Sequence, residues 1–555
     1  MYLRTTKRKR TDGSEVRYLQ LAHNDWDAEA GQSRVRVIYN FGREDELDRD
    51  AIARLISSLS RALPPEQALA AGVGGDLAFV ESRPMGAAYV LDALWRRLGI
   101  DNALRKLIQG TKRASEVERV LFALVANRAI DPSSKLAATA WVADRTHIEG
   151  LHDTDADACY RAMDWLLQIE EPLAEAVYWA TADLLNLEVD LLFFDTTSTY
   201  FEIETPDDPG EAATVGFRTY GHSKDHRADL PQVIIGMAVT RTGIPIRVWT
   251  WPGNTGDSAL IRQVKDDLHT WKLGRVVWVA DRGFTSAENR RYLQRAGGSY
   301  ILGERLRGGT PEADAALARQ GRYHTIAHNL EVKEVVVDDG VMRDRFVICR
   351  NPEQAERDRI VRDHLLTQLA DAIDGTDTLS ATKRAELAGS LPAALRRLLC
   401  TTPTGRLRID RSAVAAEERL DGKFLLRSAD PTLSVEDIAL GYKQLLEVER
   451  GWRDMKSTLE LRPVYHRLEH RIRAHVVLCW LALLLIRVAE TTTGDTWRNL
   501  RHQLDQMHLG TFTGPAGTVK RRTATTTAQA RILGALDIAQ PREFSELRPA
   551  TAPAA

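Results

Sequence analysis

The chain has 555 residues, of which 44% are hydrophobic and 27% are charged, a balance typical of folded globular proteins. This length exceeds what one hydrophobic core usually serves and predicts about two to four domains. The formal net charge of -2, from 75 basic and 77 acidic residues, excludes a chain-wide attraction for polyanions. Any nucleic-acid binding must therefore come from local patches.

Cysteine usage and apolar runs indicate the compartment. The four cysteines lie far apart without a CxxC pair, which argues against a zinc ribbon or a disulfide framework and fits a reducing, intracellular setting. The longest apolar run, residues 474–486, is too short to span a bilayer, so we expect a buried core helix there. No apolar stretch follows the N-terminal charges, so no signal peptide is expected.

The first part of the chain changes from strands to helices. Residues 1–60 predict a small strand-rich region, with strands at 16–22 and 33–42 and a helix from about Asp48. The basic run at residues 7–10 can contact DNA, but a solvated tail is the favoured interpretation. Residues 61–186 carry apolar positions at helical spacing. We expect an all-helical domain, which is large enough to hold a DNA-reading helix-turn-helix, although no spacing identifies one.

After residue 187 the pattern becomes that of alternating strands and helices. Strands are predicted at 191–201, 231–239 and 244–251, the last two joined by a turn at residues 241–243. A helix beginning near residue 255, with Asp257 or Thr255 as its N-cap, then precedes a strand, a second helix and a final strand at 299–303. Residues 187–303 therefore predict a mixed sheet with covering helices.

The remaining third divides into an insertion, closing helices and a tail. Residues 304–435 predict a β-hairpin at 331–350, a charged helix at 351–373 and a strand at 421–429, and we interpret them as an inserted subdomain. Residues 436–490 close the core with one helix from about residue 434 to 461 and another from 466 to 490. Residues 491–555 are expected to form a tail, with a basic patch at 519–523 and a disordered end.

Two carboxylates follow apolar strands at the points where those strands leave the core. Asp195 comes after Phe193 and Phe194, and Asp281 follows another apolar strand. Side chains at strand ends escape burial while the backbone stays rigid, so sites form there. One such aspartate more often begins a turn or caps a helix, but two in one sheet favour a site.

A late helix offers a third carboxylate. Tyr442, Glu449 and Lys456 are spaced seven residues apart and so fall on one helical stripe. An amphipathic helix with ordinary surface charges explains the same pattern, and the helix alone does not select Glu449. Three converging carboxylates would nevertheless repel one another without a cation, and two magnesium ions need several oxygen ligands.

These segments resemble a known family. The stretches FFDTTSTYF and VADRGFTS and the late Y-x6-E-x6-K helix resemble insertion-sequence transposases of the DDE type, in the IS-four-like group, and their order is most similar to the IS-sixteen-thirty-four branch. The resemblance covers residues 187–490. It implies an α/β fold with a ribonuclease-H-like mixed-sheet core, an inserted subdomain between the second and third carboxylates, and a mostly helical region before the core.

The resemblance also implies roles for residues. Asp195, Asp281 and Glu449 match the metal-binding catalytic triad, which implies two Mg²⁺ ions with Mn²⁺ able to substitute. Tyr442 and Lys456 match the phosphate-contacting residues of the signature. The signature has an arginine three residues after its tyrosine, where this chain has Leu445; Lys443 or Arg453 are the candidates to replace it.

Basic residues beside the carboxylates are expected to grip the DNA backbone, and this contact weakens with salt. These residues are Arg282, His222, Lys224, His226 and Arg227. His222 and His226 have the spacing of a zinc pair, but no third ligand is placed to complete such a site, and zinc is disfavoured.

The function expected is a DNA transposase that cleaves the ends of its own insertion sequence and transfers the strand. Its partners would be double-stranded DNA at the terminal inverted repeats and at the target, with a homodimer in the DNA complex and no membrane. Localisation would be cytoplasmic in a bacterium, on the nucleoid. A decayed transposase acting as a DNA-binding repressor is the alternative, hinted at only by Leu445. An aspartyl-phosphate phosphohydrolase fits poorly, because Thr197 stands where a second acid is wanted.

Overall fold

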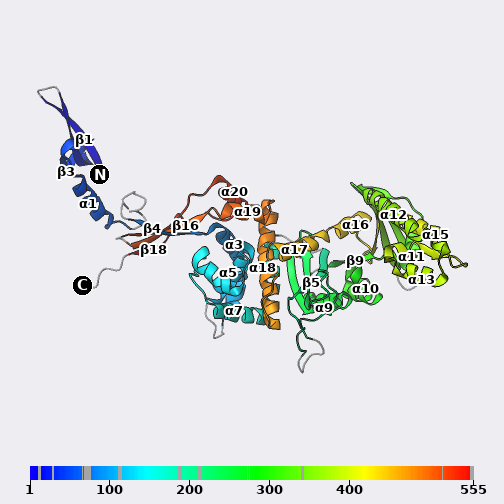
Figure 1. Cartoon of the computed structure of the whole chain (residues 1–555). Helices are drawn as coiled ribbons and strands as arrows, with labels where there is room; N and C mark the ends of the chain where they lie inside the picture. The colour runs from blue at the N-terminus through cyan, green and yellow to red at the C-terminus, as the bar shows by residue number, and fades with distance from the viewer. Residues whose placement is uncertain are drawn as a thin grey trace. The chain divides into compact units, whose positions relative to one another are not determined.

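The computed structural model divides into two compact units, each described by itself (Figure 1). The first comprises Met1–Pro84, Gln506–Thr526 and Gln540–Ala555, and the second Met85–Asp505 and Thr527–Ala539. The structure describes residues 1–10, 14–27, 31–64, 67, 77–109, 116–185, 191–209, 216–271, 273, 275–338, 343–514 and 517–549.

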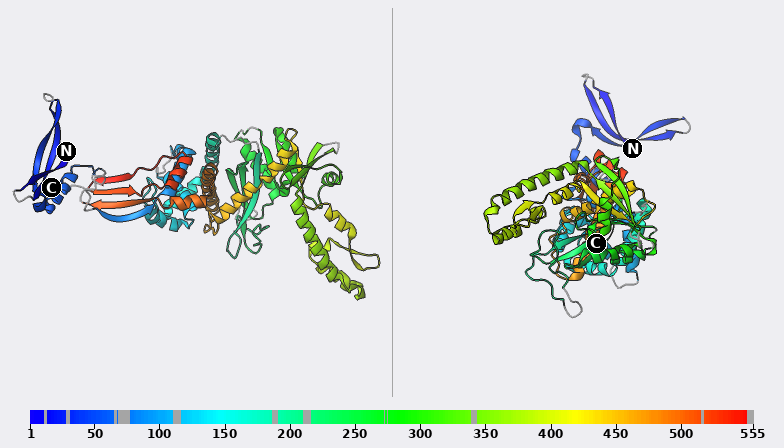
Figure 2. Two further views of the ribbon diagram at one scale, coloured as in Figure 1. Left: turned by 90° about the horizontal axis from the view of Figure 1, so that it is seen from above. Right: turned by 90° about the vertical axis from the view of Figure 1, so that its right-hand side faces the viewer.

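The first unit begins with a three-stranded antiparallel sheet, seen from two sides in Figure 2. Its strands are β1 (Tyr2–Lys9), β2 (Glu15–Asp27) and β3 (Gln32–Arg43). Helix α1 (Arg49–Ser60) follows, and the Asp48 side chain caps it by accepting from the Ala51 backbone N–H at 2.9 Å. The expected strands and helix are confirmed. The basic run begins within β1, where Lys7 pairs with Glu15 at 3.3 Å, and not in a tail.

The expectation of a tail after residue 491 is wrong for most of that segment. A second sheet in the first unit has the order β18-β17-β16-β4. Its strands are β4 (Ala78–Pro84), β16 (His508–Gly514), β17 (Gly517–Arg522) and β18 (Phe544–Pro549). Strand β16 pairs with β4 from the opposite end of the sequence, a partner that local pattern does not reveal. The APAA end lies outside the described residues.

The expectation that residues 61–186 form one all-helical domain is wrong, because strand β4 (Ala78–Pro84) lies within them and belongs to the first unit. From residue 85 the second unit begins with helices, as the apolar spacing predicts. They are α3 (Gly86–Arg97), α4 (Ile100–Ile108), α5 (Val117–Ile130), α6 (Lys135–Ala140), α7 (Ala156–Gln168) and α8 (Glu170–Leu185).

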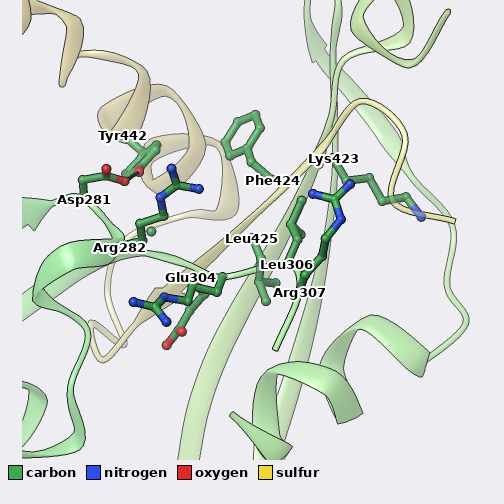
Figure 3. A pocket seen from close by; sticks show the side chains of 11 residues that line it. Asp281, Arg282, Glu304, Leu306, Arg307, Lys423, Phe424, Leu425 and Tyr442 are labelled. Atoms are coloured by element: carbon green, nitrogen blue, oxygen red, sulfur yellow. Dashed lines mark hydrogen bonds between the residues drawn. The ribbon is translucent and has the colours of Figure 1, made fainter. Parts of the chain in front are cut away.

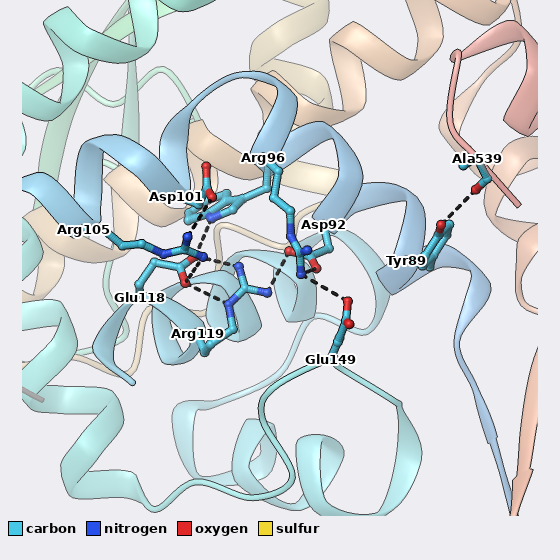
Figure 4. Close-up of polar contacts among 10 residues, drawn as sticks. Tyr89, Asp92, Arg96, Asp101, Arg105, Glu118, Arg119, Glu149 and Ala539 are labelled. Atoms are coloured by element: carbon cyan, nitrogen blue, oxygen red, sulfur yellow. Dashed lines mark hydrogen bonds and ion pairs between the residues drawn. The ribbon is translucent and has the colours of Figure 1, made fainter. Parts of the chain in front are cut away.

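A buried polar network joins α3 to α5 (Figure 4). The Arg119 guanidinium donates to Asp92 at 2.8 Å and to Glu118 at 2.6 Å. The Trp95 indole N–H also donates to Glu118, at 2.8 Å. Buried charges are tolerated when they are paired and hydrogen-bonded in this way. Arg119 therefore belongs to the interior of the helical region and is not free to meet DNA.

The core of the second unit is a nine-stranded mixed sheet of order β10-β11-β12-β15-β9-β8-β5-β6-β7. Its first five strands along the chain are β5 (Leu191–Tyr200), β6 (Gln232–Thr240), β7 (Pro245–Pro252), β8 (Val277–Ala280) and β9 (Ser299–Glu304). β5, β8 and β9 are parallel neighbours, whereas β6 pairs antiparallel with β5, and β7 pairs antiparallel with β6. Helices α9 (Asp257–His269) and α10 (Ala287–Gln294) connect them. The predicted order of strands and helices is confirmed.

Residues 304–435 continue this sheet on the β9 side. The strands β10 (His324–Ala327), β11 (Leu330–Asp338), β12 (Arg343–Arg350) and β15 (Lys423–Ser428) include the expected hairpin, β11 with β12. The segment also holds α11 (Pro311–Ala318), the expected charged helix α12 (Pro352–Ile373), α13 (Ala381–Ser390), α14 (Ala393–Arg396), β13 (Leu399–Thr401), β14 (Leu407–Ile409) and α15 (Arg411–Glu418). A small apolar core lies within the α12–α15 part.

The single helix expected from residue 434 to 461 is instead two, α16 (Val435–Lys443) and α17 (Leu446–Ser457). At the junction the Leu445 N–H bonds the Tyr442 carbonyl and the Val448 N–H bonds the Leu445 carbonyl, both three residues back. Such bonds tighten the chain into a turn of 3₁₀ type. The two helices still follow one another closely.

Helix α18 (Glu469–Thr493) confirms the buried core helix, since residues 474–489 are all buried. By length and hydropathy it is the one helix among the described residues that qualifies as a membrane span, yet 94% of its apolar window is buried. It packs against α5 and α7 and against β7. Helices α19 (Trp497–Leu504) and α20 (Thr527–Ala535) complete the unit.

Candidate active site

Asp195 and Asp281 lie next to one another where the short strand β8 ends. In the parallel pair β5 and β8, Phe194 lies opposite Ala280. Asp281 directly follows β8, whereas Asp195 lies within β5, opposite Met237 of β6. The expectation that β5 leaves the core at Asp195 is therefore wrong, since the next four residues of the strand are buried. The Phe193 and Phe194 side chains are fully buried and anchor β5, whereas the Asp195 side chain is 23% exposed. The buried strands therefore bring two carboxylates to one edge of the sheet.

The charges around Asp195 and Asp281 favour the binding of a cation. The pKa of Asp195 is raised to about 6, mainly by burial and in smaller part by the negative charges of Asp257 and Asp281, against the opposing charge of Lys224. A carboxylate with a raised pKa beside other carboxylates is stabilised when positive charge arrives.

Asp257 is a site residue that the sequence analysis missed. Its Oδ1 accepts the Thr196 hydroxyl at 2.6 Å, and its Oδ2 lies 3.2 Å from the Lys224 ammonium. The expectation that Asp257 or Thr255 caps α9 is wrong: Gly256 is the N-cap and no side chain caps it. The only sequence signal for this role is a carboxylate in the stretch PGNTGDS, residues 252–258. Its partners Thr196 and Lys224 are remote in the sequence, so the pattern does not reveal the contacts.

Lys224 turns inward to this cluster. Its ammonium donates to the Thr196 carbonyl at 2.8 Å and to the Thr196 hydroxyl at 2.6 Å, and it lies 3.9 Å from Asp195 Oδ1. Its backbone N–H donates to the Ser198 hydroxyl at 2.9 Å. The connector between β5 and β6 is thereby fastened to the strand that carries Asp195.

Tyr442 reaches the second carboxylate from α16. Its hydroxyl donates to Asp281 Oδ1 at 3.0 Å, and burial together with the charge of Asp281 raises the pKa of Tyr442. Gly303 leaves room for this contact, because a Cβ there would lie 2.3 Å from the Tyr442 hydroxyl oxygen. The hydroxyl therefore stays protonated and orients Asp281.

Lys456, two turns past Glu449 on α17, contacts the connector between β5 and β6. Its ammonium contacts Asp225 Oδ1 at 2.9 Å, and Arg462 contacts Asp225 Oδ2 at 3.1 Å. Asp225 is the neighbour of Lys224, so two adjacent residues of the connector contact the carboxylate cluster and the cations Lys456 and Arg462.

Glu449 itself is exposed on α17, between Tyr442 and Lys456 along the chain. Among the residues that the structure describes, no group of three His, Cys, Asp or Glu side chains is arranged to hold a metal ion. The structure thus brings Asp195 and Asp281 together and leaves Glu449 outside their contacts.

The other expected DNA contacts differ in exposure. Arg282, His222, His226, Lys443 and Arg453 are exposed. Arg227 is half-buried and donates to Asp229 at 2.9 Å. Leu445 is only 9% exposed, so the position that holds arginine in the family signature faces the interior here.

A cleft of about 730 Å³ opens beside Asp281 and Tyr442 (Figure 3). It is lined by the basic residues Arg282, Arg305, Arg307 and Lys423, together with Phe424 and others. Arg307 is already paired with Glu417 at 2.7 Å. Arg305 and Lys423 were missed in the sequence because they lie on segments that meet only when β15 pairs with β9.

The donor chemistry of the Asp195 and Asp281 pair fits a hard divalent metal ion, because carboxylate oxygens are the ligands that such ions prefer. The raised pKa of Asp195 and the inward-turned Lys224 ammonium both mark a place where positive charge is stabilising.

A mixed sheet with covering helices and paired aspartates on neighbouring parallel strands is an arrangement suited to metal-assisted chemistry on phosphodiesters. Residues 201–485, just over half of the chain, match the family model "Transposase DDE domain", and residues 3–68 match "IS1634 family transposase, N-terminal domain". The chain therefore belongs to the DDE transposases, in the IS1634 family, as the motifs suggested, and it is a DNA transposase.

Likenesses to solved structures are remote. The piggyBac transposase synaptic complex with hairpin DNA is 11% identical, with 76% of this chain and 78% of that chain covered and a TM-score of 0.34. The Mos1 transposase paired-end complex with the left transposon end is 9% identical, with 39% and 76% covered and a TM-score of 0.14. No curated protein matches the chain.

Proposed function

We propose that this transposase cleaves the ends of its own insertion sequence and joins the freed strand to target DNA, using Asp195, Asp281 and Glu449. The observation that carries the proposal is that Asp195, within β5, and Asp281, directly after the parallel strand β8, lie next to one another, with Tyr442 donating to Asp281. Glu449 is the third member because it lies between Tyr442 and Lys456, which both contact residues of the site.

Magnesium is the proposed cofactor, held by Asp195, Asp281 and Glu449, with Mn²⁺ as a substitute. When bound, two such ions supply activation of a water or 3′-hydroxyl and stabilisation of the leaving oxygen. Tyr442 holds the Asp281 carboxylate in place through its hydroxyl. No protein nucleophile is required.

The DNA backbone is proposed to pass along the cleft beside Asp281. Arg282, Arg305 and Lys423 line it and can neutralise phosphates. Further phosphate contacts are assigned to Tyr442, Lys456, Lys443, Arg453, His222, Lys224 and Arg227. Lys224 and Lys456 now contact carboxylates, so they reach phosphate only by exchanging those partners.

The larger organisation supports the same function. The strands β5, β6 and β7 pair antiparallel in chain order, and β8 and β9 then run parallel to β5. This order fits a ribonuclease-H-like core at residues 187–303, closed by residues 436–490. We assign residues 304–435 as the inserted subdomain and the helices that begin the second unit, within residues 85–186, as the DNA-end-binding part. Because two ends must be joined, a homodimer on DNA is proposed, acting in the bacterial cytoplasm at the nucleoid.

Three single variants test the assignment: Asp195→Ala, Asp281→Ala and Glu449→Ala. Each should abolish magnesium-dependent cleavage of DNA carrying the element end, while binding measured by fluorescence anisotropy persists. Asp371→Ala, an exposed carboxylate on α12, is the matched control and should cleave normally. Cleavage that survives in all three site variants contradicts the proposal. A wild-type protein that binds the ends without nicking them supports the repressor instead.

A further inference from the structure

Asp257 connects the segments that carry the two paired aspartates. It is the first residue of α9, and its Oδ1 accepts the hydroxyl of Thr196, the residue after Asp195. On its other side, a Cβ placed on Gly283, two residues after Asp281, would lie 3.6 Å from Asp257 Oδ2. Asp257 therefore stands at the site from a third element, the helix α9 that follows β7.

The main partner of Asp257 is the Lys224 ammonium. Lys224 Nζ lies 3.2 Å from Asp257 Oδ2 and 3.9 Å from Asp195 Oδ1. Coulomb attraction falls with distance, so Asp257 is the carboxylate that holds this cation, with help from the Thr196 hydroxyl and carbonyl. If Asp257 lost its charge, Asp195 would become the nearest carboxylate to the ammonium.

A purely structural role for Asp257 has a distinct signature. An acidic residue in the first turn of a helix is favoured by the helix dipole, and Asp257 occupies that turn. Its side chain does not cap the helix, however, and both of its oxygens are engaged across the site. A helix-dipole role would not depend on Lys224.

We propose that Asp257 is a positioning residue of the active site, which holds the Lys224 ammonium aside so that Asp195 stays available to a divalent cation. The inference rests on the proposed function, which assigns Asp195 as a cation ligand. Lys224 is thus an internal cation that competes for Asp195 once Asp257 no longer restrains it.

The test measures Mn²⁺ binding to the full chain without DNA, from the electron paramagnetic resonance signal of the free ion at one fixed pH. Asp257→Asn should weaken binding by about tenfold, within the range of couplings between neighbouring charged groups. Adding Lys224→Met to Asp257→Asn should restore affinity, because the competing ammonium is gone. Lys224→Met alone should bind at least as tightly as wild type.

Two further variants guard the interpretation. Asp257→Ser also removes the charge, and serine is a residue favoured near helix N-termini. This variant replaces Asp257→Asn in the Mn²⁺ measurement if Asp257→Asn does not fold. Asp267→Asn, on the same helix but bonded to Trp249, should bind Mn²⁺ like wild type. Affinity of the Asp257 variants within twofold of wild type, or a loss that Lys224→Met does not reverse, overturns the inference.

The Asp195→Asn arm separates this inference from the proposed function. If Asp195→Asn loses Mn²⁺ binding while the Asp257 variants keep it, the metal site stands and only the positioning role fails. If Asp195→Asn binds as wild type does, or wild type binds no Mn²⁺, the proposed metal site fails and the inference fails with it.

Discussion

Gly303→Ala should disable the contact between Tyr442 and Asp281 with a single methyl group. The added Cβ would lie 2.3 Å from the Tyr442 hydroxyl oxygen, 3.1 Å from its Cζ and 3.3 Å from Asp281 Oδ1. Gly303 does not have the positive φ that favours glycine, so the backbone accepts alanine. The tyrosine must therefore move, and the 3.0 Å hydrogen bond to Asp281 is lost.

The expected magnitude follows from the charge of the acceptor. A hydrogen bond to a charged group contributes about 1.5–3 kcal/mol, and about 1.4 kcal/mol is tenfold in rate. Cleavage should therefore slow by about 10- to 150-fold in Gly303→Ala. Tyr442→Phe should slow it similarly. The double variant should resemble Tyr442→Phe, because phenylalanine lacks the oxygen that the new Cβ would strike.

The cleavage rate of each variant is measured under single-turnover conditions with element-end DNA and magnesium, and DNA affinity is determined separately by anisotropy. Gly389→Ala, where a Cβ would meet nothing within 4 Å, is the matched control and should cleave normally. Unchanged cleavage by Gly303→Ala refutes the reasoning, and so does a double variant whose loss is the product of the two single losses.

Two further predictions concern charge elsewhere. Asp225→Asn removes the carboxylate that Lys456 and Arg462 share, so DNA affinity measured by anisotropy should rise. A plot of the logarithm of affinity against the logarithm of salt concentration should also become steeper, by about one unit for each additional phosphate that the freed cations neutralise. Lys135 is buried and its pKa is lowered to about 7 by desolvation. The unfolded chain then binds more protons than the folded one between about pH 7 and 10, so stability should rise with pH there. Lys135→Met should raise the melting temperature at pH 7 by removing a penalty on the order of a few kcal/mol, with the gain shrinking at higher pH.

Matched controls decide both predictions. Asp266→Asn, whose carboxylate accepts the Tyr292 hydroxyl, should leave DNA affinity and its salt dependence unchanged; an equal change in both aspartate variants contradicts the first prediction. Lys383→Met, at an exposed position, should leave the melting temperature unchanged. A Lys135→Met variant that melts lower than wild type at pH 7 contradicts the second.

Local pattern was sufficient for the elements that carry Asp195 and Asp281. Apolar runs of strand length specify buried strands, and the order from β5 to β9 follows from such runs alone, although β5 continues past Asp195 to Tyr200. The same holds for the helix α18, since a run that is apolar on every side must be buried. Family membership was likewise legible in three short motifs.

Tertiary structure decided which elements meet. Ser82 and His508 contact each other from positions 426 residues apart, and β15 joins β9 to extend the sheet; neither pairing has a local signature. Asp257 looked like a helix cap because caps use the same residue types as polar clusters. Its contacts with Thr196, 61 residues away, and with Lys224 arise only from strand order. Periodicity encodes which side chains are buried, whereas the partner across a site depends on how the chain returns to the sheet.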